Sequence, residues 1–354
     1  MKNEKEIERK EGGKTMKKLP EVNESFEELY GMLIGPIKSK LLLTGIELGF
    51  FNQLSEPKSA EAVAEALGTH SENTRLFLDG LAASDLTVKR NGLYQNTPDT
   101  QTFLVEGSST FLGQMFSLQS QMWDPALNDM SKLVKEGALQ HSPDAAMGSE
   151  EMWAQFAAFM ANYERAGVAQ QAVEIVSELP EFSSFRKMLD LGGGPGVTGI
   201  AIVGAHPSMK GVIFDRPAII KVAETFITEY EMEDRMAVLA GDYNGDSIGE
   251  GYDLIWASNT LNFGRHDLDS LMKKIYDALN PGGVFISFCE GLTNERTKPD
   301  FVVTSMMSIA LMGQDMCFDQ GEIGDSMLRV GFKSVRSRTL DAPWGTADLD
   351  IGRK

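Results

Sequence analysis

Three consecutive glycines and a fourth two residues later close the stretch MLDLGGGPG, which runs from Met188 to Gly196. Glycine at this density accepts positive φ angles and leaves backbone N–H groups uncovered, which suits a ligand that must approach the main chain closely. A tight strand-to-helix turn without any ligand has the same composition. No Gly-Lys-Ser/Thr ending follows, so the turn is not a P-loop and no triphosphate is expected.

Acidic residues after the next two apolar runs distinguish between nucleotide-like ligands. GVIFDRP contains Asp215, about twenty residues after the glycines, where a carboxylate can accept both hydroxyls of a ribose. LAGDYN then places Asp242 and Tyr243 at the following strand end. There a carboxylate can accept the exocyclic amine of adenine while an aromatic ring covers its face. An NAD enzyme shares the ribose acid, so it is the three features together that indicate S-adenosylmethionine.

The elements that must position these residues begin after Phe185. Short apolar segments alternate there with helical patterns, which predicts a Rossmann-like α/β domain with a parallel, doubly wound sheet. Ligands of such sheets bind beyond the carboxyl ends of the strands. A helical segment, FVVTSMMSIALMG, and a helix from about Gly321 to Val330 follow, and FKSVRSRTL is expected to form an antiparallel edge strand.

The part from Ser25 to Gly113 predicts a mostly helical domain with a β-wing, which is the winged-helix arrangement. Ser59 and Ser71 are predicted helix N-caps, and Gly68 ends the first of these helices. Residues 60–81 contain one arginine against several acids, and the whole chain has a net charge of −18. Nucleic acid is therefore not an expected partner.

A second helical block extends from Phe111 to Leu179 and is rich in methionine and aromatic residues, most of which are expected in the core. The side chains expected to contact an apolar methyl acceptor are Trp153, Met160, Tyr163 and Met307. The predicted division of the chain is a disordered tail over 1–24, a winged-helix dimerisation domain over 25–110, a helical acceptor-pocket segment over 111–180 and a cofactor-binding domain over 181–354.

Composition limits where the protein works. No apolar run reaches the roughly 18 residues that a membrane span needs, and the charged first 18 residues lack the apolar core of a signal peptide. Cys289 and Cys317 fit no disulfide framework or zinc spacing and are expected to be buried thiols. The sequence thus predicts a cytoplasmic protein with no membrane partner and no metal.

With these motifs in place, the chain resembles the small-molecule O-methyltransferases that carry an N-terminal winged-helix dimerisation domain. This family includes caffeate and acetylserotonin O-methyltransferases and has bacterial and archaeal members. The resemblance runs from about Phe26 to Val335 through IELGFFNQL, LDLGGGPG, FDRP, GDY, IYDALNPGG and VGFKSV. It implies methyl transfer from S-adenosylmethionine to a small molecule and a homodimer. The cofactor-binding residues expected from the motifs and the resemblance are Asp190, Gly192, Gly194, Asp215, Arg216, Asp242, Tyr243 and Ser258.

The family's catalytic motif is rewritten in this chain. Counted from Asp253, the position of the family's histidine base falls on Asn262, whose amide takes no proton at neutral pH. Ser258 replaces the basic residue that often lies beside the adenine. Glu290 matches the carboxylate that orients the histidine, although a strand-end acid or helix cap accounts for it as well. Where the family has a second acidic partner later in the chain, this sequence has GQDMCFD, so that acid is lost or displaced.

Three hypotheses follow. In the first, the acceptor is already nucleophilic, as in an S- or C-directed transfer, and needs mainly alignment and desolvation; Asn262 then holds the acceptor and Glu290 fixes Asn262. In the second, His266 is a relocated base and the protein is a conventional O-methyltransferase. In the third, a non-catalytic regulatory protein retains the cofactor pocket. The intact cofactor residues favour an enzyme.

Overall fold

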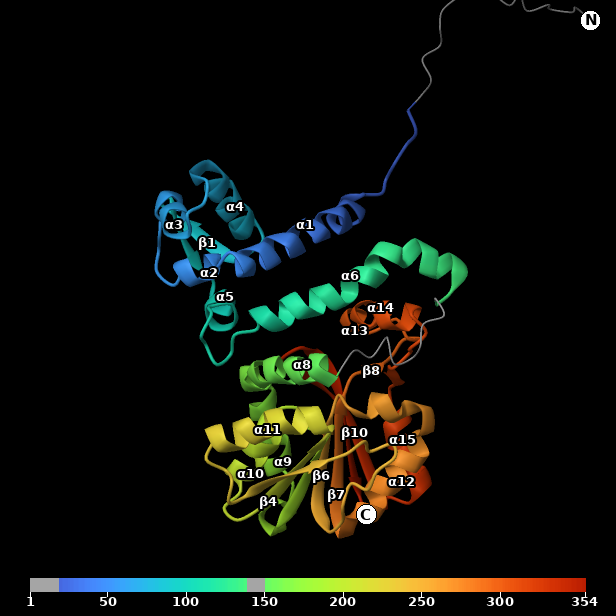
Figure 1. Cartoon of the computed structure of the whole chain (residues 1–354). Helices are drawn as coiled ribbons and strands as arrows, with labels where there is room; N and C mark the ends of the chain where they lie inside the picture. The colour runs from blue at the N-terminus through green and yellow to red at the C-terminus, as the bar shows by residue number, and fades with distance from the viewer. Residues whose placement is uncertain (1–18, 139–149) are drawn as a thin grey trace, which may run out of the picture.

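The computed structural model describes residues 19–138 and 150–354, and it places a small helical domain above an α/β domain (Figure 1). Of the predicted tail, residues 1–18 lie outside the described residues, and residues 19–26 form no regular element. The small domain consists of α1 (Glu27–Glu47), α2 (Phe50–Gln53), α3 (Ala60–Leu67), α4 (Ser71–Ala83), the hairpin β1 (Thr87–Arg90) and β2 (Leu93–Asn96), and α5 (Pro98–Phe103). This is the helix and wing order that the sequence predicts.

One of the two predicted helix caps is confirmed. The Ser59 hydroxyl accepts a hydrogen bond from the Ala62 N–H at 3.3 Å, and Gly68 ends α3 in the left-handed conformation. The prediction for Ser71 is wrong, because Ser71 is already the first helical residue of α4. His70 is the cap instead: its backbone stays extended, and its ring Nδ1 accepts from the Asn73 N–H at 3.3 Å. The helix start was misplaced by one residue because histidine is seldom a cap.

The helical middle block links the two domains. It comprises α6 (Gly113–Glu136), α8 (Glu150–Tyr163), the π-helical turn η1 (Glu164–Val168) and α9 (Ala169–Ser177), while residues 139–149 lie outside the described part. In Figure 1, α6 lies between α1 and the short helices α13 (Asp300–Ser305) and α14 (Met307–Leu311). Backbone angles leave the helical range at Ala166 and Gly167, so α8 and α9 change direction there.

The α/β domain contains one seven-stranded sheet in the order β10-β11-β7-β6-β3-β4-β5. Its strands are β3 (Lys187–Leu191), β4 (Lys210–Asp215), β5 (Met236–Ala240), β6 (Tyr252–Ser258), β7 (Leu279–Cys289), β10 (Ser334–Ala342) and β11 (Gly345–Arg353). The five neighbouring strands β7, β6, β3, β4 and β5 are parallel, and β5 forms one edge of the sheet. Helices α9, α10 (Val197–Ala205) and α11 (Pro217–Glu229) cover one face, and α12 (Leu268–Ala278) and α15 (Glu322–Val330) cover the other (Figure 1). The predicted Rossmann-like, doubly wound fold is confirmed.

The last part of the chain differs from expectation by one strand. β10 is the predicted antiparallel edge, but β11, which sequence reading missed, lies between it and β7 and pairs antiparallel with both. The strand contains Asp348 and Asp350, which are both buried and accept hydrogen bonds from hydroxyl groups of β10. Among the described residues, no helix combines the length and the apolar character needed to cross a bilayer.

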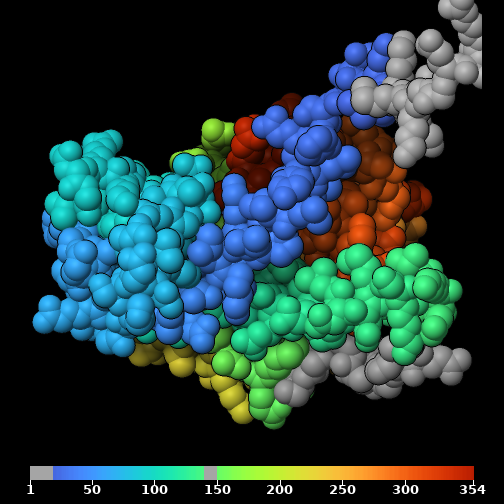
Figure 2. All heavy atoms as spheres, turned by 90° about the horizontal axis from the view of Figure 1, so that it is seen from above, coloured from blue at the N-terminus to red at the C-terminus, as the bar shows by residue number. Residues whose placement is uncertain are grey.

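From its leucine and phenylalanine content, the sequence predicts that GPIKSKLLLTGIELGFFNQL, residues 35–54, packs against a second copy of the chain, but most of the exposed apolar side chains of this region lie before it. Phe50 and Phe51 are buried within the small domain, where the Phe51 ring packs directly against Gly45 of α1. The exposed apolar side chains instead line the beginning of α1 and the residue before it; they are Phe26, Leu29, Tyr30, Met32, Leu33 and Ile37. Figure 2 shows α1 open on the upper face of the molecule.

We expect this exposed stripe to be covered in a two-fold dimer, because a single chain leaves an apolar patch of this size in water. Light scattering should give about twice the chain mass of 38.8 kDa. Substituting both Leu29 and Leu33 with Glu should give the monomer mass, whereas the control Leu328→Glu, at an exposed leucine on α15, should leave the dimer intact. A wild-type monomer at micromolar concentration would contradict the expectation.

Candidate functional site

The glycine turn closes β3 at the carboxyl end of the sheet. The N–H groups of Gly192 and Gly193 donate to the Phe214 carbonyl oxygen at 2.8 and 3.2 Å, which fastens the turn to β4. Gly192 has a φ of 63°, and a Cβ at this position would overlap the Thr260 hydroxyl. A Cβ on Gly194, by contrast, would meet nothing within 4 Å. The turn therefore packs tightly on one side and leaves space for a ligand on the other.

Asp215 lies beside this turn, as the sequence predicts. Its Oδ2 accepts from the Gly194 N–H at 2.8 Å and its Oδ1 from the Arg216 N–H at 2.7 Å. Each carboxylate oxygen keeps a further lone pair for a ligand hydroxyl. Burial raises the pKa of Asp215, and the two backbone N–H groups act in the opposite direction. The Arg216 side chain is half-buried at the start of α11.

The residues expected around the adenine, Asp242, Tyr243 and Ser258, differ in how far they are exposed to solvent. The Asp242 side chain is exposed, and its Oδ1 accepts from the Asn244 N–H at 2.9 Å. Tyr243 is buried in the core, and its hydroxyl donates to the Thr260 carbonyl oxygen. This contact supports the segment behind Gly192, a role that sequence reading did not indicate. Ser258 lies half-buried at the end of β6.

Two buried acids hold the helix that follows the glycine turn. Asp190, 2% exposed, accepts from the Gly199 N–H at 3.1 Å, and burial raises its pKa to about 7. Glu164 of η1 accepts from the N–H and the hydroxyl of Thr198 at 2.7 and 2.8 Å. Burial, followed by the nearby Asp190 carboxylate, raises the pKa of Glu164 to about 8. Glu164 was missed because an acid inside a helical pattern carries no signal of its contact across the fold.

We expect the ligand-free protein to lose stability as pH rises, and Glu164 to carry much of this loss. Its folded pKa of about 8 lies above its ordinary value of 4.5, so the folded protein holds the extra proton. The corresponding stability is fully present below 4.5 and is lost as pH rises through 8. Thermal melts across this range should show the slope in the wild type and a flatter curve in Glu164→Gln. An unchanged slope in the variant would contradict the assignment.

The predicted catalytic residues lie at the carboxyl ends of β6 and β7. Asn262 belongs to the 3-10 helix η3 (Leu261–Asp267), and its Oδ1 is buried without a hydrogen-bond partner in the described part of the chain. Asn259, which sequence reading missed, has a left-handed φ of 47° and an equally unpartnered buried Oδ1. Its N–H donates to the Phe288 carbonyl oxygen at 3.1 Å, so it lies beside the end of β7.

Glu290 directly follows β7 and is half-buried. Burial raises its pKa, and its charge in turn helps to raise the pKa values of Tyr163 and Cys317, both close enough to sense it. Within residues 19–138 and 150–354, Oδ1 of Asn262 is unpartnered and no hydrogen bond joins Glu290 to Asn262, so the expectation that Glu290 fixes the amide stays a prediction.

His266 is exposed in the last turn of η3. Its ring therefore faces solvent, which is unfavourable for a base that must work in a closed pocket. Cys289 is buried and Cys317 half-buried, and both are free thiols. No group of three or more His, Cys, Asp or Glu suited to a metal ion occurs among the described residues.

The aromatic side chains of α8 reach both parts of this site. The Trp153 ring packs edge to face against Phe263 of η3, with ring centres 5.7 Å apart. Tyr163, at the end of the same helix, packs against Trp344 at 5.8 Å and lies near Glu290. Met160 is half-buried between them along α8, whereas Met307 on α14 is 38% exposed. The structure thus places Trp153 beside η3 and Tyr163 near Glu290, where the predicted catalytic residues lie.

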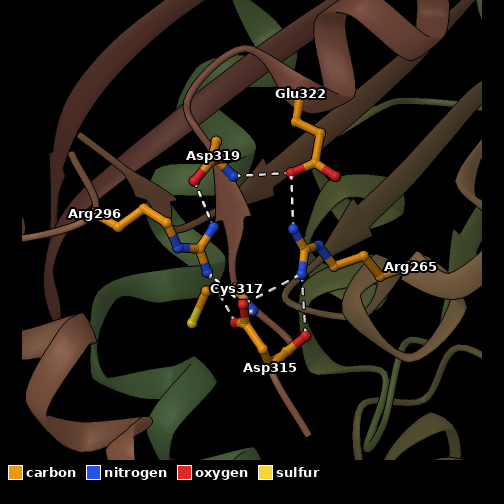
Figure 3. A network of polar contacts seen from close by, with 6 residues as sticks. All are labelled: Arg265, Arg296, Asp315, Cys317, Asp319 and Glu322. Carbon is orange, nitrogen blue, oxygen red and sulfur yellow. Dashed lines mark hydrogen bonds and ion pairs between the residues drawn. The ribbon is translucent and has the colours of Figure 1, made fainter. Parts of the chain in front are cut away.

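An ionic network borders this end (Figure 3). Arg296 binds Asp315 at 2.7 Å and Asp319 at 2.5 Å, while Arg265 of η3 donates to the Asp315 carbonyl oxygen at 3.1 Å and to Glu322 at 3.3 Å. Arg296 ends a run of three consecutive residues with positive φ, 294–296, a conformation that the ion pairs help to hold. The network includes Asp315 and Asp319 of the GQDMCFD stretch, and it ties η3 to the segment before α15 and to Glu322 at its start.

Comparisons with known proteins agree with this geometry. The chain matches the O-methyltransferase domain over residues 131–325 and the O-methyltransferase dimerisation domain over residues 31–106. It is 26% identical over 257 residues to N,N-dimethyltransferase OxyT of Streptomyces rimosus, covering 71% of this chain and 74% of the relative. It is 25% identical over 334 residues to acetylserotonin O-methyltransferase of Bos taurus, covering 90% and 95%.

Solved structures share the fold. Human N-acetylserotonin methyltransferase in complex with SAM superimposes with a TM-score of 0.77 at 22% identity, covering 95% of this chain and 99% of that one. An O-methyltransferase family protein from Burkholderia thailandensis gives 0.73 at 18% identity, covering 94% and 99%. The domain match includes more than half of the chain, together with the glycine turn, Asp215 and the catalytic end. The chain therefore belongs to the O-methyltransferase family and carries that family's dimerisation domain.

Proposed function

We propose that this protein transfers the methyl group of S-adenosylmethionine to a small molecule without a histidine base. The observation that carries the proposal is the junction of the glycine turn with Asp215, where Gly194 leaves open space beside a carboxylate with free lone pairs. The human relative of the same fold binds SAM, as its name records. When bound, S-adenosylmethionine supplies a methyl group on a positively charged sulfur, which a nucleophile attacks in line.

The residues that would hold this cofactor follow the order of the strands. Asp215 is placed to accept the ribose hydroxyls, and the turn at Gly192 and Gly194 brings the main chain close to the ligand. Asp242 keeps one carboxylate oxygen for the adenine amine, since the described residues engage only Oδ1. Asp190 acts indirectly, because its carboxylate accepts a hydrogen bond from the Gly199 N–H near the N-terminus of α10.

The absence of a base at Asn262 defines the acceptor. A phenol needs its proton removed during attack, and an amide does not remove it. The exposed His266 is poorly placed to substitute. A thiolate, a thioether sulfur, arsenite or a stabilised carbanion is nucleophilic on its own, so alignment and exclusion of water by aromatic side chains such as Trp153 and Phe263 become the protein's main contribution.

Removing the Asp215 carboxylate tests the cofactor assignment. Asp215→Ala should raise the dissociation constant for S-adenosylmethionine roughly tenfold, as expected for a charge-assisted hydrogen-bonding group worth about 1.5–3 kcal/mol. Calorimetry is the measurement, and Asp234→Ala is the matched control, since Asp234 is exposed between α11 and β5. Tight binding of NAD with no binding of S-adenosylmethionine would overturn the proposal. Binding of S-adenosylmethionine without turnover of any acceptor would favour a regulatory protein.

A further inference from the structure

Resting on the proposed methyl transfer, we propose that the methyl acceptor is an amine, bound at the carboxyl ends of β6 and β7 with its N–H groups on Asn259 and Asn262 and its charge facing Glu290. The inference keeps methyl transfer without a histidine base but assigns the acceptor atom to nitrogen in place of an acceptor that needs no base, and it gives Glu290 a direct role. Four features of the catalytic end carry it.

The first feature is the pair of unpartnered amide oxygens. Oδ1 of Asn259 and Oδ1 of Asn262 are both buried without a hydrogen-bond donor in the described part of the chain. A buried acceptor left unpaired costs about 1–3 kcal/mol, so two of them on one short segment call for a donor from outside the chain. A protonated or neutral amine supplies N–H donors, whereas a thiolate, a thioether or a carbanion supplies none.

The second feature is the isolation of Glu290. None of the ion pairs of the described residues includes it, and burial raises its pKa. Its charge helps to raise the pKa values of Tyr163 of α8, Cys289 of β7 and Cys317 before β9 (Phe318–Asp319), none of which is a cation. A carboxylate removed from water is stabilised by a bound cation and destabilised by a bound anion. An ammonium group fits this position, and a thiolate does not.

The third feature is the engagement of the two nearby arginines. Arg265 and Arg296 lie close enough to Cys317 to influence its ionisation, but both are held in the ionic network of Figure 3. Their two positive charges face three negative ones, from Asp315, Asp319 and Glu322. The network therefore carries one excess negative charge and offers no spare cation to an anionic acceptor.

The fourth feature is the chemistry available to Glu290. An ammonium nitrogen has no lone pair, so it must lose a proton before attack, and a carboxylate with a raised pKa is a better proton acceptor than an exposed one. The proton passes to Glu290, the freed nitrogen lone pair forms a bond to the methyl carbon, and the carbon–sulfur bond breaks with its electrons staying on sulfur. The products are the methylated ammonium ion and the neutral thioether, and Glu290 returns the proton to water.

A series of matched probes tests the inference. Calorimetry in the presence of S-adenosylhomocysteine should show phenethylamine binding roughly tenfold or more tightly than phenethyl alcohol, with hydrocinnamate weakest, because only the amine pairs with Glu290. Glu290→Gln should remove most of this preference. Glu295→Gln, the same charge change at an exposed residue nearby, should keep it. With S-adenosylmethionine, mass spectrometry should find methylated phenethylamine and little methylated phenethyl mercaptan.

The outcomes separate the two proposals. Equal binding of the probes, tighter binding of hydrocinnamate, no binding of the amine, or an unchanged preference in Glu290→Gln would each overturn the amine assignment. The wild-type series decides the matter even where Glu290→Gln does not fold. Binding of S-adenosylmethionine, measured separately in the wild type, reports on the proposed function alone.

Discussion

Gly192→Ala should abolish useful cofactor binding, with affinity for S-adenosylmethionine falling roughly hundredfold or more. A residue with a Cβ at a φ of 63° pays about 1–2 kcal/mol for the left-handed conformation. The new Cβ also overlaps the Thr260 hydroxyl, and overpacking of this kind costs about 1–3 kcal/mol more. The turn must move to relieve both, and it carries the backbone that approaches the ligand. Calorimetry and a thermal melt measure the two effects.

Gly194→Ala is the matched control for this prediction. Its φ of 56° gives the same left-handed strain, but its Cβ meets no protein atom within 4 Å. We therefore expect a smaller loss of melting temperature than in Gly192→Ala. A reduced affinity for S-adenosylmethionine at near-normal stability would place the ligand in the space beside Gly194. Equal melting temperatures for the two variants would contradict the role given to the Thr260 contact.

Asn262→Ala should reduce turnover by about ten- to a hundredfold, since it removes an acceptor-positioning contact and not a base. Loss of a true general base typically costs about 10²–10⁴-fold. His266→Ala should leave turnover close to that of the wild type, because the ring is exposed. The rate should follow the ionisation of the acceptor itself and show no fall below about pH 6.5 that a histidine would impose.

The opposite result for these two variants is equally informative. If His266→Ala abolishes turnover while the affinity for S-adenosylmethionine is unchanged, η3 must rearrange to bring the ring into the pocket. The protein is then a conventional O-methyltransferase acting on a hydroxyl group. Steady-state rates of both variants, measured beside cofactor affinity, distinguish the two cases.

Local signals were sufficient for the glycine turn, Asp215 and the parallel, doubly wound type of the sheet. Each depends on residues close in sequence: glycine where φ is positive, an acid at a strand end, and apolar runs between helical patterns. The misplaced cap at Ser71 also belongs to this level, where propensity favoured serine over the histidine beside it. Such errors shift an element by one residue and leave the site unaffected.

Contacts between residues far apart in the chain could not be predicted from the sequence. Glu164 became a partner of Thr198 only because η1 folds back onto α10. β11 was not predicted, because aspartates in a sequence are normally expected to face solvent. In the structure they are buried and accept hydrogen bonds from hydroxyl groups of β10. The ionic network joins residues 265, 296 and 315–322. The sequence around each of these residues does not indicate which of the others it pairs with.

The end of α8 has a thermodynamic consequence. Tyr163 lies near Glu290, on the side proposed for the acceptor. The next residue, Glu164, accepts a hydrogen bond from Thr198 of α10, the helix that follows the glycine turn. The end of α8 and the first residue of η1 therefore lie next to both parts of the candidate site. If occupation of one half fixes this helix end, the other half binds its ligand with less ordering left to do, and the gain is reciprocal by necessity. Donor and acceptor affinities are then linked properties, each measured correctly only when the other ligand's concentration is stated.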